Sequence, residues 1–237
     1  MKFILPNMRI IQSLINIKMK YRDFFEFNST KTPYFFHSYN NFSLTPRAIE
    51  IPIIKYYLDK YPHDRVLEIG NVTKHYYEEF KDFKVKDTID KFELAYDVIN
   101  IDIKDYLTKE KYDFIYSIST FEHMDSDGGR NPDYLPIDED KFTSHAFKNM
   151  DHVINNLLKE NGKFIITFPI DQDNCEIDRS LYNEEYNKFN AKQIDIYFFK
   201  QINNYFWTQI QTDVETFSKE KPKSPKDKFL CLMKIIK

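Results

Sequence analysis

The chain has 237 residues, of which 42% are hydrophobic and 17% aromatic, a composition that supports a folded core and excludes a disordered protein. Its net charge of −3 provides no field for a polyanion, so we do not expect nucleic acid as a partner. No stretch approaches the ~20 uninterrupted apolar residues that span a membrane. Cys175 and Cys231 lie far apart without metal-ligand spacing. We therefore expect a cytoplasmic protein in a reducing compartment, without a metal site.

The N-terminal part of the chain differs in composition from the rest. Residues 1–45 are rich in aromatic residues and asparagine, and we interpret them as an N-terminal extension or lid. The main domain is then expected at residues 46–237. Thr45-Pro46 suits a helix N-cap followed by the first helical position, and Tyr61-Pro62 would end that helix.

From residue 65 onward short apolar strands alternate with helical patterns. Strands are expected at residues 66–69, 85–89, 98–101, 114–118, 163–168, 194–200 and 229–236. The clearest helices are expected at 73–81 and 141–159. Strands separated by helices form right-handed crossovers and parallel sheets, whereas the terminal strand would return antiparallel. The sequence thus predicts an α/β, Rossmann-like fold with a seven-stranded mixed sheet, helices on both faces and the last strand antiparallel.

The first strand is followed by the most informative motif. Glu68 lies near the end of the strand, Gly70 and Asn71 follow it, and Asp90 lies at the end of the next strand, twenty positions after the glycine. A glycine lets a ligand approach the backbone, and an acid at this distance accepts hydrogen bonds from both hydroxyls of a ribose. The spacing favours a nucleotide-like ligand.

Other polar residues are predicted to lie at the same edge of the sheet, because ligands of open α/β sheets bind beyond the carboxyl ends of the strands. These positions are residues 68–71, Asp90, residues 100–102, residues 119–123 and residues 169–173. Together they would provide carboxylates, hydroxyls and one imidazole around a ribose, an amino group and an amino-acid moiety.

Five segments in this order, VLEIGN, TIDKFE, VINIDI, YDFIYSISTFEHM and NGKFIITFPI, resemble the class I S-adenosylmethionine-dependent methyltransferases. The resemblance covers about residues 45–175. It is greatest to a subgroup that has GNV where most members have GxGxG, and whose genes commonly lie near those for glycan or surface-polysaccharide synthesis. S-Adenosyl-L-methionine is the cofactor that the resemblance implies.

The resemblance also assigns cofactor contacts by position. Glu68 and Gly70 would meet the methionine amino end, Asp90 the ribose, Asp102 the adenine amino group, and Ser119 the methionine portion. The residues implied to bind the cofactor are Glu68, Gly70, Asn71, Asp90, Asp102 and Ser119.

The acceptor side is less defined. His123 follows Glu122 near the reacting methyl group and is the candidate catalytic base, although this pair could instead only shape the pocket. The polar insertion at residues 126–140 is either a substrate loop or surface decoration. Arg47 and Glu50 are interpreted as a structural salt bridge, with a place under the cofactor as the alternative.

The sequence therefore predicts a methyltransferase that methylates oxygen on a small polar acceptor in capsule or glycan synthesis. The acceptor would be a sugar, a nucleotide sugar or a phosphorylated metabolite, and the oligomeric state is left open. One alternative is a non-catalytic partner subunit or scaffold of the same fold. Another is a nicotinamide-dependent oxidoreductase, which would require more glycines in the first loop.

Overall fold

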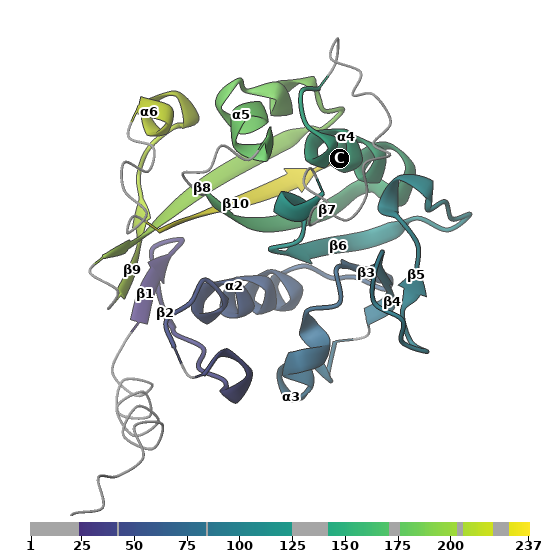
Figure 1. Ribbon diagram of the computed structural model, residues 1–237, viewed down its shortest axis with the longest axis horizontal. Coiled ribbons are helices and arrows are strands. Elements are labelled where there is room, and N and C mark those ends of the chain that lie inside the picture. The colour runs from purple at the N-terminus through teal and green to yellow at the C-terminus, as the bar shows by residue number, and fades with distance from the viewer. Residues whose placement is uncertain are drawn as a thin grey trace, which may run out of the picture.

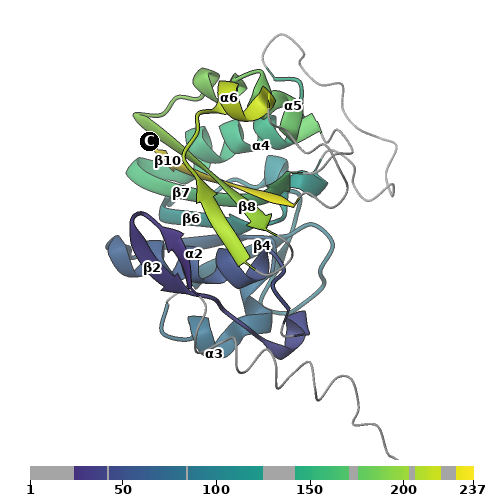
Figure 2. The same cartoon turned by 90° about the vertical axis from the view of Figure 1, so that its left-hand side faces the viewer.

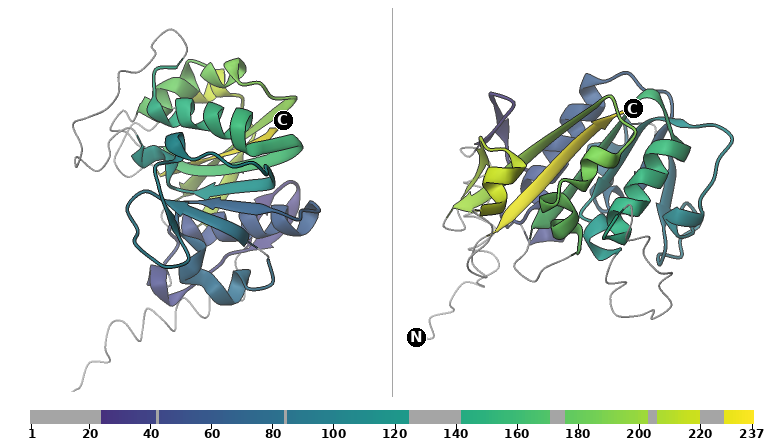
Figure 3. Two further views of the ribbon diagram at one scale, coloured as in Figure 1. Left: turned by 90° about the vertical axis from the view of Figure 1, so that its right-hand side faces the viewer. Right: turned by 90° about the horizontal axis from the view of Figure 1, so that it is seen from above.

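The computed structural model describes residues 24–41, 43–83, 85–124, 142–170, 176–202, 206–219 and 228–237. Helices cover both faces of a central sheet (Figure 1). On one face lie α2 (Arg47–Lys60) and α3 (Tyr77–Phe80), and on the other lie α4 (His145–His152), α5 (Glu176–Tyr182) and α6 (Val214–Lys219) (Figure 3). None of the described helices is long and apolar enough to cross a membrane.

Within the described residues, the central sheet has eight strands in the order β5-β4-β3-β6-β7-β10-β8-β9. They are β3 (Val66–Ile69), β4 (Val85–Asp90), β5 (Ile99–Asn100), β6 (Tyr112–Ile118), β7 (Leu158–Ile170), β8 (Gln193–Ile202), β9 (Phe206–Ile210) and β10 (Phe229–Ile236). The neighbouring strands from β5 to β7 pair in parallel, and β10 is antiparallel to both β7 and β8. The predicted Rossmann-like α/β fold with a mixed sheet is confirmed, including the antiparallel last strand.

The predicted count of seven strands was wrong by one, because β9 was interpreted as part of a connection. β9 pairs antiparallel with β8 at the edge of the sheet. Among its residues only Trp207 is fully buried, so the alternation of buried and exposed residues is weak. The backbone N–H of Trp207 donates to the hydroxyl of Tyr34 at 2.6 Å, so this strand depends on a contact with a distant segment.

Two hydrophobic cores lie on opposite faces of the sheet. Figure 2 shows the helices that cover these two faces. Successive side chains of a strand point to opposite faces. In β3, Leu67 and Ile69 pack with α4 and α5, whereas Val66 packs with α2. In β6, Ile115 lies in the first core and Tyr116 in the second. The continuous apolar strands seen in the sequence thus reflect a sheet that is buried on both faces.

The described part of the N-terminal segment contains an antiparallel hairpin of β1 (Phe24–Phe27) and β2 (Thr30–Pro33). Its two turn residues, Asn28 and Ser29, both have positive φ, as a tight two-residue hairpin requires. Phe27 has no exposed surface and packs in the same core as α2. We propose that this hairpin belongs to the same folding unit as the sheet.

Three helix predictions differ from the structure at their ends. The helix expected at 141–159 begins at His145, because Ser144 caps the N–H of Phe147 at 3.1 Å. It continues as a π-helical turn, Val153–Leu157, and β7 starts at Leu158. The stretch expected at 73–81 divides into a 3₁₀ turn, Thr73–Tyr76, and the short α3. At α2, the predicted Thr45 cap is absent, because the helix begins after Pro46 and no side chain caps it.

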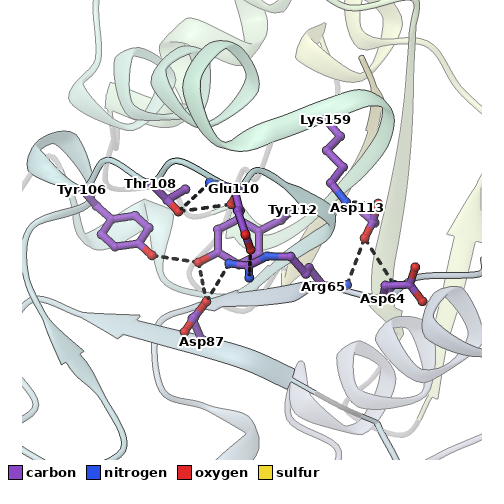
Figure 4. A network of polar contacts seen from close by, with 9 residues as sticks. All are labelled: Asp64, Arg65, Asp87, Tyr106, Thr108, Glu110, Tyr112, Asp113 and Lys159. Atoms are coloured by element: carbon purple, nitrogen blue, oxygen red, sulfur yellow. Dashed lines mark hydrogen bonds and ion pairs between the residues drawn. The ribbon is translucent and has the colours of Figure 1, made fainter.

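A polar network lies where β3 and β6 begin, at the end of the sheet opposite the predicted ligand edge (Figure 4). The Arg65 guanidinium lies 2.8 Å from Glu110 Oε2 and 3.5 Å from Asp87 Oδ2, and stacks 5.0 Å from the centroid of the Tyr112 ring. The Tyr112 hydroxyl donates to Asp87 at 2.6 Å. These contacts join three neighbouring strands without using any predicted site residue.

Asp113 ties the same end of the sheet to β7. Its carboxylate accepts hydrogen bonds from the N–H groups of Arg65 (3.0 Å) and Asp64 (3.3 Å), and lies 2.8 Å from Lys159 Nζ. Burial opposes the charge, but the hydrogen bond to Lys159 and the two N–H donors outweigh it and lower the pKa of Asp113. The ionised form is therefore the one that stabilises the fold.

We expect Asp113→Ala to lower the free energy of unfolding by about 1–2 kcal/mol near pH 7, since it removes hydrogen bonds to a charged group. Asp113→Asn should cost less, because it keeps an acceptor for the N–H groups. Because the folded pKa lies below the unfolded one, the loss should disappear as the pH falls through the folded pKa. Urea denaturation from pH 2 to 7 measures this, and a loss that does not shrink toward the acid end would contradict it.

Candidate functional site

The loops that follow β3 and β6 touch at the switch in strand order, where β4 lies on one side of β3 and β6 on the other. Gly70 has φ +85°, and a Cβ at this position would lie 2.2 Å from Thr120 Oγ1. Only glycine fits such a conformation and such a contact. Gly70 therefore lets the two loops meet at the place where open α/β sheets bind ligands.

Glu68 organises the loop after β3. Its Oε1 accepts hydrogen bonds from the N–H groups of Val72 (3.0 Å) and Thr73 (2.7 Å), and its Oε2 accepts one from Thr73 Oγ1 (2.5 Å). The residue is only 2% exposed. Burial raises the pKa of Glu68 to about 7, against the effect of these three donors. Its bonds in the structure are thus internal and fix the 3₁₀ turn.

Asp90 joins the loops after β3 and β4. Its Oδ1 accepts hydrogen bonds from the N–H groups of Phe92 and Glu93, both at 2.9 Å, and its Oδ2 accepts one from the N–H of Asn71 at 3.2 Å. A carboxylate oxygen can accept two hydrogen bonds, so Oδ2 has capacity for a further donor. The side chain is half-buried. Asp90 therefore lies beside the Gly70 loop and can still accept a hydroxyl group.

Asn71 carries a buried polar atom that the fold does not use. The residue is 8% exposed, and its Nδ2 has no hydrogen-bond partner among the described residues. A buried amide without a partner costs free energy, and most such groups in proteins are paired. This atom is the first indication of a ligand at this edge.

Asp102 lies further along the same edge. Its carboxylate caps the N–H of Lys104 at 3.3 Å and lies 3.2 Å from Lys91 Nζ. The neighbouring Asn100 donates to the backbone carbonyls of Asp90 (3.1 Å) and Lys91 (2.9 Å). Asp102 is thus linked to the Asp90 turn through Lys91.

Ser119 takes part in a buried charge network that reaches α2. Its Oγ donates to Glu50 Oε1 at 2.6 Å, and Thr167 Oγ1 donates to the same oxygen at 2.8 Å. Arg47 Nη1 donates to Glu50 Oε2 at 2.6 Å, which confirms the predicted salt bridge. Burial opposes the charge, but Glu50 keeps the pKa of Arg47 above its ordinary value. The network fixes the strained backbone of Ser119, whose φ is +39°.

Glu122 and His123 differ in their surroundings although they are adjacent. Both lie in η4 (Phe121–His123), the 3₁₀ turn that follows β6. The side chain of Glu122 is 7% exposed, whereas that of His123 is 74% exposed. His123 Nε2 lies 3.7 Å from Glu122 Oε1. Glu122 Oε2 is buried and has no hydrogen-bond partner within the part of the chain that the structure describes.

The structure thus brings together four of the predicted cofactor residues, Glu68, Gly70, Asn71 and Asp90, through hydrogen bonds and loop contacts. Ser119 instead donates a hydrogen bond to Glu50 in α2, and the Asp102 carboxylate forms an ion pair with Lys91. The insertion at 126–140 and the residues at 171–173 lie outside the described residues. Within the described ranges, no group of His, Cys, Asp and Glu side chains is arranged to hold a metal ion.

The sequence placed Thr120 within residues 119–123 at the expected ligand edge but gave it no role of its own, and it did not indicate Thr167. Thr120 determines why position 70 must be glycine, and Thr167 donates to Glu50 from the next strand. Neither contact is visible in the sequence, because each joins residues that are distant along the chain.

No protein-family model and no curated protein sequence matches the chain. Solved structures of similar fold include NodS, an N-methyltransferase of Bradyrhizobium japonicum in complex with S-adenosyl-L-homocysteine, with 11% identity and a TM-score of 0.44 over 78% of this chain and 83% of that one.

Two further similar structures are methyltransferases by their descriptions. A SAM-dependent methyltransferase of Archaeoglobus fulgidus has 13% identity and a TM-score of 0.45 over 79% of this chain and 94% of that one. A possible histamine N-methyltransferase of Thermotoga maritima has 12% identity and a TM-score of 0.45 over 79% and 88%. At these identities the likeness concerns the fold alone.

Proposed function

We propose that the chain is an S-adenosylmethionine-dependent methyltransferase that acts on a small polar acceptor. The observation that carries the proposal is the group of Gly70, Asn71 and Asp90 at the switch in strand order. There a half-buried carboxylate lies beside a glycine turn and a buried amide without a partner among the described residues. Such an edge suits a ligand with a diol and further polar groups.

The residues present fit this cofactor. Asp90 would accept a hydrogen bond from one ribose hydroxyl through the remaining capacity of Oδ2, and Asn71 Nδ2 would donate to the cofactor. Glu68 would act indirectly, because its carboxylate holds the loop after β3 that carries Asn71. Asp102 and Ser119 remain candidates for contacts with the adenine and methionine ends, as the family resemblance implies.

The chain's own contribution to methyl transfer would be mainly positional. The cofactor supplies an activated methyl group on a good leaving group, so alignment of the acceptor accounts for most of the rate. Glu68, Glu50 and Ser119 hold the loops after β3 and β6 by buried hydrogen bonds, which keeps the site rigid. A base is needed only to remove a proton from the acceptor.

For the acceptor, a nucleophile that carries a proton is proposed, either a hydroxyl or an amino group. The link to sugars, nucleotide sugars and glycan synthesis rests on the sequence resemblance. A screen of such compounds with labelled cofactor, followed by mass analysis of the product, would identify both the acceptor and the methylated atom. Methylation of none of these compounds would remove the glycan link and leave the cofactor site intact.

The cofactor site can be tested without an acceptor. We expect the wild-type chain to bind S-adenosylhomocysteine, and Asp90→Ala to weaken this binding by about 1–3 kcal/mol, because a ribose hydroxyl loses its acceptor. Isothermal titration calorimetry measures both. Asp105→Ala is the matched control, because Asp105 is exposed and paired with Lys104, and its affinity should equal that of the wild type.

Two outcomes would reject parts of this proposal. If the folded wild-type chain binds neither S-adenosylhomocysteine nor S-adenosylmethionine, the chain is better explained as a non-catalytic relative, such as a partner subunit or scaffold. If it binds but Asp90→Ala binds equally well, the cofactor lies elsewhere on the sheet edge. A ligand at 100 times its Kd should raise the stability of the wild type by about 2.7 kcal/mol, which gives an independent readout.

A further inference from the structure

Glu122 has a buried carboxyl group that the fold itself does not explain. Its turn, η4, packs against α4, α5 and β7. The side chain is 7% exposed, and Oε2 has no hydrogen-bond partner among the described residues. Burying such a group is unfavourable unless a partner arrives. Its position directly after β6 puts it at the edge of the sheet where the cofactor is proposed to bind.

The charges around Glu122 favour a cation. Arg47 and Glu50 act on it from α2, and Asp178 acts on it from α5. The Arg47 charge is already engaged by Glu50 at 2.6 Å, so the carboxylates outnumber the available positive charge. Burial has the largest effect on Glu122 and raises its pKa to about 8, and the charges of Glu50 and Asp178 act in the same direction. The hydrogen bond from its own backbone and the charge of Arg47 lower the pKa, but they do not outweigh burial. At neutral pH, before any ligand binds, Glu122 therefore stores a proton.

A second observation at the same edge points to a ligand. Asn71 Nδ2 is also buried without a partner among the described residues, and its loop touches the loop before Glu122 through Gly70 and Thr120. Two adjacent loops thus each present one unused polar atom. The Asn71 amide suits the proposed cofactor. The Glu122 carboxyl group, which has Glu50 and Asp178 near it, suits a second molecule that is positively charged.

We propose that Glu122 binds the acceptor and takes its proton, and that the acceptor's nucleophile is a primary or secondary amine. This inference rests on the proposed methyltransferase function and names the acceptor class. Glu122, rather than the exposed His123, is then the catalytic base.

The proton and electron balance follows from this assignment. When the ammonium group binds, Glu122 releases its stored proton to solvent and pairs with the cation. The ammonium then transfers one proton to Glu122 Oε2, and the freed nitrogen lone pair forms the bond to the methyl carbon. The carbon–sulfur bond breaks with its electrons on sulfur, and Glu122 later returns its proton to solvent. No oxidant or further reactant is needed.

The simplest probe is methylammonium chloride, with sodium chloride at equal concentration as the reference, on protein saturated with S-adenosylhomocysteine. We expect methylammonium to raise the wild-type Tm by about 3 °C over the reference at ten times its Kd. Glu122→Gln keeps the shape and removes the charge, so its Tm should not rise. His123→Asn should retain the rise, and loss of the rise in His123→Asn alone would overturn the assignment.

The pH dependence provides the second readout. Methylammonium stays cationic between pH 6 and 8, whereas the ionised fraction of Glu122 grows by about tenfold per pH unit below its pKa. The affinity of methylammonium for the wild type should therefore rise by roughly 10–100-fold from pH 6 to pH 8. Any affinity that Glu122→Gln retains should not change with pH. Besides His123 beside it, the groups facing Glu122 are Arg47, Glu50 and Asp178.

The outcomes separate this inference from the proposed function. If the wild type binds S-adenosylhomocysteine but methylammonium stabilises it no more than sodium chloride does, the amine acceptor is wrong and the methyltransferase assignment stands. An affinity that does not change with pH would also overturn the role of Glu122. If S-adenosylhomocysteine itself does not bind, the proposed function fails first.

Discussion

Glu50→Gln is expected to lower the free energy of unfolding by about 3 kcal/mol. Glu50 has no exposed surface and is the only described partner of Arg47 Nη1, which it binds at 2.6 Å. Removing one member of a buried ion pair typically costs about 3–5 kcal/mol, because the remaining charge is left without compensation. Since the Arg47 side chain is 23% exposed, the lower end of that range is expected. Urea denaturation at neutral pH measures the change.

A double-mutant cycle isolates the ion pair from the other contacts of Glu50. A glutamine at position 50 can still accept from Ser119 and Thr167, so the charge is the main loss. The double variant Arg47→Met/Glu50→Gln should be about 2 kcal/mol more stable than the sum of the two single changes predicts. Strict additivity would show that the pair contributes nothing beyond its separate contacts.

The matched control is a pair with the same spacing on the protein surface. Lys81 and Glu78 are also three residues apart in sequence and lie 2.8 Å from each other, but both are exposed. Exposed pairs contribute little to stability because water screens them. Glu78→Gln should therefore leave the unfolding curve unchanged.

The strand pattern was predictable because it depends on local sequence. β3, β6 and β10 are runs rich in apolar residues, and such runs are visible without any knowledge of their neighbours. β9 was missed because its stability comes from pairing with β8 and from Tyr34, which is distant in the chain. The start of α4 was misplaced because Ser144, not the first apolar residue, determines it.

The site was predictable only in outline. The order of acids and glycine along the first two strands is visible in the sequence, and the structure brings Asn71 and Asp90 within hydrogen-bond distance. How each carboxylate is used is not visible there. Glu68 and Asp90 look equivalent in the sequence, and each accepts three internal hydrogen bonds, yet Glu68 is only 2% exposed whereas Asp90 is half-buried and can still be reached by a ligand. The difference in burial between Glu122 and His123 also depends on helices packed from elsewhere.

Gly70→Ala is expected to destabilise the chain by about 3 kcal/mol and to abolish binding of S-adenosylhomocysteine. The positive φ of +85° is strained for any residue with a Cβ and costs about 1–2 kcal/mol. The new methyl group would also lie 2.2 Å from Thr120 Oγ1, and overpacking of this kind costs about 1–3 kcal/mol. Thr120 is a short side chain next to the backbone, so relief requires the loop after β6 to move. Chemical denaturation and calorimetry measure the two effects.

The clash and the backbone strain can be separated with Thr120→Gly. All three atoms nearest to the position of the new methyl group belong to the Thr120 side chain, so a glycine there removes the contact and leaves the φ strain. Gly70→Ala should therefore cost only about 1–2 kcal/mol in the Thr120→Gly background. An equal loss in both backgrounds would show that the conformation alone requires glycine. No loss in either would mean that the two loops do not meet as the structure has them, and the proposed cofactor site would have to be abandoned.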